Sequence, residues 1–128
     1  MSTQTNPILG TYLLKGTIGN IATPGAPIVH FSLVVTPAKH QVSGSVFITQ
    51  ATQNGNYSGN VRGTIYATGL GSVTQIVALT GSVNNDGTMP LELSFEAHLA
   101  VNQHWEGTGG FRYGAVHVDE APVAQLAQ

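Results

Sequence analysis

The chain has 128 residues, of which only 4 are basic and 6 acidic, and it contains no cysteine. A typical soluble domain has about a quarter of its residues charged, so neutral Thr, Ser, Asn, Gln and Gly must cover most of this surface. The length predicts one domain over residues 1–128. The composition excludes disulfides and thiolate metal sites, and four scattered cations predict neither nucleic-acid binding nor a polybasic lipid patch.

The first residues, 1–7, are polar and uncharged, and we expect them to form an N-terminal tail. They lack the basic region and apolar stretch of a classical signal peptide. The longest apolar runs are also far too short to cross a bilayer. We therefore expect no membrane insertion, and a protein that is cytoplasmic or exported without a classical signal peptide.

Alternation of polar and apolar residues dominates the chain, and no segment shows a helical stripe. This pattern predicts an all-β fold, a single-domain antiparallel β-barrel or β-sandwich of about seven to eight strands in meander order. Seven strands are expected at Ile8–Ile18, Ile28–Thr36, His40–Gln50, Tyr57–Thr68, Val73–Val83, Leu91–Val101 and His104–Tyr113. A weaker eighth segment lies at Ala115–Asp119, and residues 120–128 are expected to form a C-terminal tail.

The connections between these segments carry turn signals. Asn54-Gly55 and Asp86-Gly87 are typical of hairpins, because their residues tolerate the positive φ angles that such turns require. The segment Thr23–Pro27 predicts a rigid, irregular link. Short links between successive strands favour a meander.

A pattern of apolar residue, polar residue, Gly, Ser or Thr, and apolar residue recurs in four strands. The copies are Leu14–Ile18, Val42–Val46, Val61–Ile65 and Leu79–Val83, with a degenerate copy at Trp105–Gly109. Strand parity places each glycine on the apolar side. Two interpretations stay open: the glycines let strands coil and approach closely, or they leave space for bulky side chains on the facing wall.

The opposite parity places several apolar side chains on the outside of the sheet. These candidates for an assembly interface are Leu9, Leu13, Phe47, Tyr66 and Ile76. Several exposed apolar residues on adjacent strands, with almost no charge between them, form the kind of patch that marks association. Few edge residues of the type that blocks strand pairing are present.

The ionisable residues cluster on one predicted hairpin. Glu96 and His98 share the outward parity of one strand, and His104 and Glu106 share it on the next. Histidine and glutamate side chains brought together across such a hairpin would be able to bind zinc or to act as acid and base. An exposed ladder of alternating charges is the favoured interpretation. With no nucleophile motif in the chain either, we expect no enzyme, no metal and no cofactor.

Four aromatic residues, Tyr12, Tyr57, Trp105 and Tyr113, have core parity. If the barrel were open at one end, their ring faces would be available to stack on a sugar. A neutral carbohydrate is therefore the alternative partner.

The stretch Pro24–Val35, followed by Val42-Ser43-Gly44, Thr49-Gln50-Ala51, Val61-Arg62-Gly63 and Leu79-Thr80-Gly81, resembles a bacterial family known only as domain of unknown function 1842. The resemblance covers residues 24–81 and consists of strand patterns. It implies a bacterial source, and it assigns no catalytic or binding residue.

The scarce charge, the outward apolar residues and the lack of a catalytic constellation together predict a non-enzymatic structural protein. We expect it to assemble with itself into a homo-oligomer or fibre through neutral strand faces, edges and tails. A lectin-like module that binds a neutral sugar is the alternative.

Overall fold

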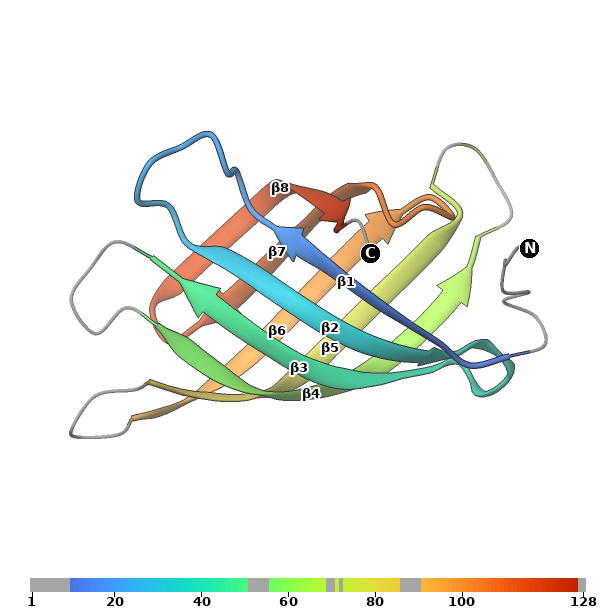
Figure 1. Ribbon diagram of the computed structural model, residues 1–128, viewed down its shortest axis with the longest axis horizontal. Coiled ribbons are helices and arrows are strands. Elements are labelled where there is room, and N and C mark those ends of the chain that lie inside the picture. Colours follow the sequence, from blue (N-terminus) through green and yellow to red (C-terminus); the bar gives the residue numbers. More distant parts are fainter. Residues whose placement is uncertain (1–9, 51–55, 69–70, 72, 86–90, 127–128) are drawn as a thin grey trace.

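The protein is a closed barrel of eight antiparallel strands in a computed structural model (Figure 1). The structure describes residues 10–50, 56–68, 71, 73–85 and 91–126. Each strand pairs with the next, and β8 pairs with β1. The strands are β1 (Tyr12–Ile18), β2 (Ile28–Thr36), β3 (Gln41–Thr49), β4 (Tyr57–Ala67), β5 (Gln75–Asn85), β6 (Glu92–Val101), β7 (Gly107–Tyr113) and β8 (Val116–Gln125), with a 3-10 turn, η1 (Pro37–Lys39), after β2.

The inner face of the wall forms one apolar core. The largest fully buried side chains are Trp105, Tyr113, Phe95 and Phe111, and the inward Val, Leu and Ile residues of the strands join them in a single cluster. An eight-stranded barrel has an interior just wide enough for side chains to fill. The alternating residues therefore face the inside and the outside of one closed barrel. Of the two predicted architectures, barrel and sandwich, the protein adopts the barrel.

Aromatic residues close the core toward each end of the barrel. Where β1 begins, the Trp105 indole donates a hydrogen bond to the Tyr12 hydroxyl over 3.4 Å, and its ring centroid lies 6.1 Å from that of Phe31. At the other end the Tyr113 ring lies 5.4 Å from that of Tyr57 and stacks on Phe111 at 6.1 Å. Phe31, Trp105, Phe111 and Tyr113 are buried, and the half-buried Tyr12 and Tyr57 pack against them.

The recurrent glycines lie where neighbouring strands approach each other closely. A side chain at Gly44, Gly63 or Gly81 would overlap a carbonyl oxygen of the adjacent strand. At Gly16 it would also meet the Phe31 ring. Close approach of adjacent strands is therefore the reason for these glycines. The Phe31 ring at Gly16 belongs to the paired residue of the adjacent strand β2, and not to a facing wall.

Several strand boundaries were predicted wrongly. β1 begins at Tyr12 rather than at Ile8. β7 begins at Gly107 rather than at His104, because residues 102–106 form a turn in which Trp105 adopts a left-handed φ of 59° and is buried. β5 covers Gln75–Asn85 rather than Val73–Val83. Residues 1–9 and the two hairpin signals at 54–55 and 86–87 lie outside the described residues.

The predicted C-terminal tail is also wrong, because most of residues 120–128 belongs to a strand. β8 runs to Gln125 and buries Ala121 and Val123. Asp119 and Glu120 are both exposed, which interrupts the alternation and looks like a strand end. The β7–β8 register shifts near this point and Glu120 has a φ of 54°, an irregularity that restores the inward parity.

β8 closes the barrel through a short seam. It pairs with β1 at Gly16, Thr17 and Ile18, whereas the other neighbouring strands share between six and eleven residue pairs. The Leu126 amide extends the seam by donating to the Lys15 carbonyl over 2.8 Å. In the described part of the chain, no helix has the length and apolar character needed to span a membrane.

Candidate functional site

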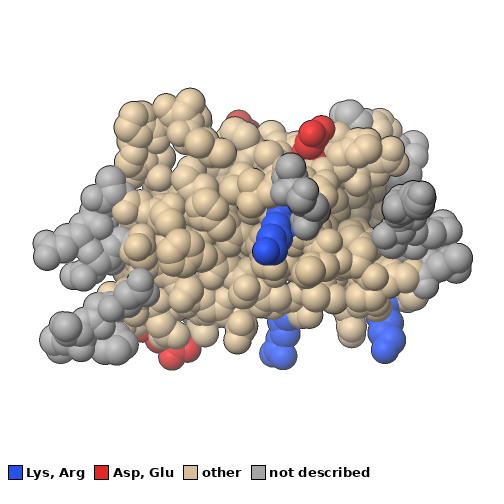
Figure 2. Space-filling model, viewed as in Figure 1, with Lys and Arg blue, Asp and Glu red and all other residues tan. Residues whose placement is uncertain are grey.

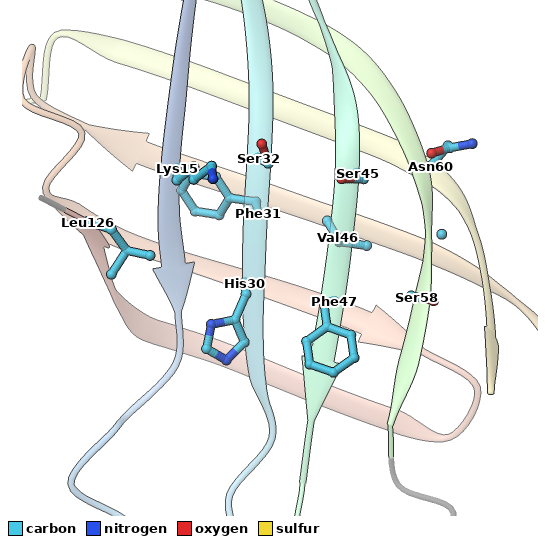
Figure 3. Close-up of a pocket in the computed structure, with 11 residues that line it drawn as sticks. Lys15, His30, Phe31, Ser32, Ser45, Val46, Phe47, Ser58, Asn60 and Leu126 are labelled. Atoms are coloured by element: carbon cyan, nitrogen blue, oxygen red, sulfur yellow. The ribbon is translucent and has the colours of Figure 1, made fainter. Parts of the chain in front are cut away.

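The outer wall of β1 to β4 carries a groove, which we call the outer groove. It has a volume of about 480 Å³ and opens to solvent. Figure 3 shows that its residues come from four adjacent strands and from the chain just after β8. The lining residues are Lys15, His30, Phe31, Ser32, Ser45, Val46, Phe47, Ser58, Gly59, Asn60 and Leu126.

Strand register brings the exposed members of this set together. One row runs across the strands from Lys15 through Ser32 and Ser45 to Asn60. In antiparallel sheets such directly opposed residues point to the same face. The row places a series of neutral hydroxyl and amide groups along one side of the groove.

A second row supplies aromatic surface. His30 pairs with Phe47, and Phe47 pairs with Ser58. The two rings are tilted by 43° with centroids 6.2 Å apart, and they lie side by side in Figure 3. Thr49 Oγ1 lies 3.5 Å from His30 Nε2. Phe47 is 43% exposed, so the groove offers an apolar ring beside neutral polar groups.

Charge is scarce on this face of the molecule. Lys15 is the one charged residue among the described residues that line the outer groove. Figure 2, which looks onto the face formed by β1 to β4, shows a few isolated charged side chains on a surface that is otherwise uncharged. A ligand or partner of this face would therefore be recognised by shape, apolar contact and neutral hydrogen bonds.

The predicted interface residues lie in separate places on the outer wall. Leu13, 61% exposed, pairs with the exposed Val34. Phe47 lies in the outer groove, nearer the end of the barrel that carries the β1–β2 connection. Leu9 lies outside the described residues.

Tyr66 and Ile76 form a third apolar site near the opposite end of the wall. They face each other across β4 and β5, and both are exposed. The His40 ring stacks on Tyr66 with centroids 4.9 Å apart, and His40 Nδ1 lies 3.2 Å from the Ile65 carbonyl oxygen. The single apolar patch expected from the sequence is therefore divided into three smaller apolar sites.

The four ionisable candidates do not converge. His98 lies on β6 opposite Gly110, whereas the His104 amide donates to Asn102 Oδ1 in the β6–β7 turn. Glu96 faces Arg112, as in the charged ladder that the sequence favoured, and Glu106 lies in the turn. The described residues contain no group of three or more His, Asp or Glu side chains placed to hold a metal ion.

Of the four aromatic residues considered for sugar stacking at an open barrel end, Trp105 and Tyr113 are buried, and Tyr12 and Tyr57 are half-buried. Trp105 is 2% exposed and Tyr113 is 1% exposed. Burial, and to a smaller extent the neighbouring Tyr57, raises the pKa of Tyr113 to about 12. Tyr113 donates its hydroxyl hydrogen to Gln50 Oε1 over 3.0 Å, so it closes the barrel instead of lining an entrance.

Sequence reasoning missed most of the outer groove. Parity places Ser32, Ser58 and Asn60 outward, but only the register shows that they lie beside Phe47. Leu126 escaped notice because its segment was predicted as a tail. The one signal available in advance was the shared outward parity of small polar residues on neighbouring strands.

Comparison with known proteins identifies the family of this chain. No curated protein matches the chain. A family model described as a domain of unknown function, DUF1842, matches residues 9–117, which includes seven of the strands and the beginning of β8. The chain therefore belongs to the DUF1842 family.

Proposed function

We propose that this protein is a non-enzymatic structural protein that associates with copies of itself through the uncharged outer wall of the barrel. The observation that carries this proposal is the outer face of β1 to β5. There, exposed Leu13, Phe47, Tyr66 and Ile76 lie on a wall whose charged residues are Lys15 and Arg62. Burying one such side chain contributes roughly 1.5–3 kcal/mol before the entropy of association is subtracted.

The short β1–β8 seam also supports association through the outer face of β1. Leu13 lies on the part of β1 that precedes the seam, and its side chain is mostly exposed. Barrel closure removes most of the strand edge that the sequence predicted, so the faces of the strands carry the proposal.

Sedimentation velocity over a wide concentration range tests the proposal. Raising the salt from about 0.01 M to about 1 M shortens the Debye length from roughly 30 Å to roughly 3 Å. We expect concentration-dependent association that changes little over this range, because few charges are involved. A monomer at every concentration and salt would contradict the proposal.

Single substitutions locate the surface. We expect at least one of Leu13→Asp, Phe47→Asp, Tyr66→Asp and Ile76→Asp to weaken association by about tenfold or more, because a buried unpaired charge is strongly unfavourable. Ser94→Asp is the matched control, since it adds the same charge to an exposed position on β6. Equal association of all five variants would exclude these faces.

A lectin-like function, binding of a neutral carbohydrate in the outer groove, is the second candidate. It is supported by the exposed Phe47 ring among Ser32, Ser45, Ser58 and Asn60, because neutral sugars are recognised by apolar ring contact and neutral hydrogen bonds. A panel of neutral oligosaccharides, read by binding and by the shift in melting temperature, tests it. Phe47→Ala should abolish binding and Tyr66→Ala should not; absence of binding across the panel would reject this function.

A further inference from the structure

We propose that the outer groove receives the β1–β2 loop of a second copy of this chain, in a two-fold dimer. The loop comprises residues 19–27, and this inference rests on the self-association proposed above. It names the segment that enters the groove and the symmetry of the contact.

The β1–β2 loop presents the most exposed large apolar side chain among the described residues. Ile21 is 71% exposed. The loop projects from the barrel in Figure 1, and its sequence contains no charged residue. An exposed isoleucine on an uncharged, projecting loop is the kind of apolar surface that marks a contact site.

Internal hydrogen bonds hold the loop in a defined shape. The Ala22 amide donates to Asn20 Oδ1 over 3.1 Å, and the Thr23 amide donates to the Asn20 carbonyl over 3.1 Å. A tight turn follows, in which the Ala26 amide donates to the Thr23 carbonyl and Gly25 has a φ of 80°. A segment that is ordered before it binds loses less entropy in the contact.

The outer groove is complementary to this loop in chemistry. It exposes Phe47 and Leu126, which are 43% and 42% exposed, to meet an apolar side chain. Its serines and Asn60 offer neutral donors and acceptors to the backbone of the loop, and Lys15 offers a cation to carbonyl groups. The loop and the groove of one chain do not cover each other, because Ile21 and Phe47 both remain exposed.

The position of the loop beside the groove favours a two-fold contact. The loop joins β1 and β2, and the same two strands supply Lys15, His30 and Ser32 to the groove. When two such chains face each other across a two-fold axis midway between loop and groove, each loop meets the groove of the other chain. This contact closes on itself and stops at a dimer.

Cross-linking of single-cysteine variants tests the contact. The chain contains no cysteine, so each variant carries one thiol at a chosen position. Ile21→Cys is mixed with an isotope-labelled Ser45→Cys variant under oxidising conditions, and the disulfide-linked species are identified by mass. Ser94→Cys replaces Ser45→Cys in the control, because Ser94 is also an exposed serine on the outer wall but lies on β6. We expect the mixed Ile21–Ser45 product to exceed the Ile21–Ser94 product by about tenfold or more.

Sedimentation equilibrium of the unsubstituted protein accompanies the cross-linking and should give a dimer. We expect Ile21→Asp to weaken dimerisation by about tenfold or more and Ile21→Leu to retain it. At concentrations low enough for the unsubstituted protein to be monomeric, both variants should keep its melting temperature, because the side chain is exposed. A protein that associates without preferential cross-linking to Ser45, or that forms species beyond the dimer, would overturn this inference alone. A protein that remains monomeric would overturn the self-association as well.

Discussion

Gly63 shows why single residues in this wall have little freedom. It lies on β4 opposite Leu79 of β5, and an added Cβ would overlap the Ala78 carbonyl oxygen. Relief of that overlap requires movement of backbone atoms, which is more costly than rotation of a side chain. The sequence placed this glycine in a strand, but its neighbour is a backbone atom of another strand.

We expect Gly63→Ala to lower the free energy of unfolding by about 1–3 kcal/mol, the usual cost of overpacking. Urea denaturation measures this loss. Ser43→Ala is the control, because Ser43 is exposed on β3 and its substitution should change stability by no more than about 0.5 kcal/mol. Equal stability of Gly63→Ala and the unsubstituted protein would show that the strands separate here without cost.

Tyr113 makes the stability of the barrel depend on alkaline pH. Its pKa is about 12 in the folded chain, whereas an unfolded chain has a tyrosine pKa of about 10. Below pH 10 the phenol is neutral in both states and its full contribution is present. Between about pH 10 and pH 12 the unfolded state alone loses the proton, so the free energy of unfolding falls as the pH rises.

We expect Tyr113→Phe to reduce this alkaline decline. Burial also raises the pKa of Tyr12, although its hydrogen bond with Trp105 opposes the rise, so part of the decline should remain. At neutral pH the variant should lose about 1 kcal/mol, because the hydrogen bond to Gln50 is gone. Denaturation at several pH values measures both effects, and Tyr66→Phe controls for removal of an exposed hydroxyl. An unchanged alkaline slope would contradict the assignment.

The β6–β7 turn shows how one element positions the core. Asn102 Oδ1 accepts hydrogen bonds from the His104 amide at 2.8 Å and the Glu106 amide at 3.0 Å. The Trp105 amide donates to the Asn102 carbonyl over 3.0 Å. These bonds hold Trp105 in its left-handed conformation, which places the indole over the core.

We expect Asn102→Ala to destabilise the protein by about 1–3 kcal/mol, because two amide donors lose their acceptor. Asn102→Asp retains the oxygen and should retain most of the stability. Chemical denaturation followed by the fluorescence of the single tryptophan measures both variants. Gln103→Ala is the control at the exposed neighbouring position, and equal losses at 102 and 103 would contradict this role of Asn102.

At the scale of the whole molecule, β8 decides whether the barrel closes. Its second half pairs with β1 on one side and β7 on the other, and it buries Ala121 and Val123. The sequence predicted a C-terminal tail over residues 120–128, whereas the structure uses residues up to Gln125 to complete the wall.

We expect truncation after Glu120 to abolish cooperative thermal unfolding, because core residues of β1 and β7 would lose a neighbouring strand. Deletion of residues 127–128 alone is the control, since it leaves all of β8 in place. Calorimetry with far-ultraviolet circular dichroism compares the two chains. A truncated chain that melts as the full chain does would show that residues 121–128 are a tail after all.

The sequence by itself determined the properties that depend on near neighbours in the chain. Alternation of residue type predicted the strands, the all-β class and the face on which Phe47 or Glu96 would lie, because side-chain direction in a strand repeats every two residues. The left-handed turn at Trp105 and the irregularity at Glu120 interrupt that repeat. The predicted start of the seventh strand at His104 and the predicted end of the eighth at Asp119 were wrong for this reason.

The sequence also predicted the meander order, but only the tertiary structure decided the register of the strands and the closure of β8 on β1. Closure of β8 on β1 and the meeting of Ser45 with Asn60 beside Phe47 depend on pairing between segments that lie apart in the sequence. A shift of one residue in register exchanges the faces of a strand. The outer groove therefore follows from the folded barrel, whereas the scarcity of charged residues along the chain already predicts its neutral chemistry.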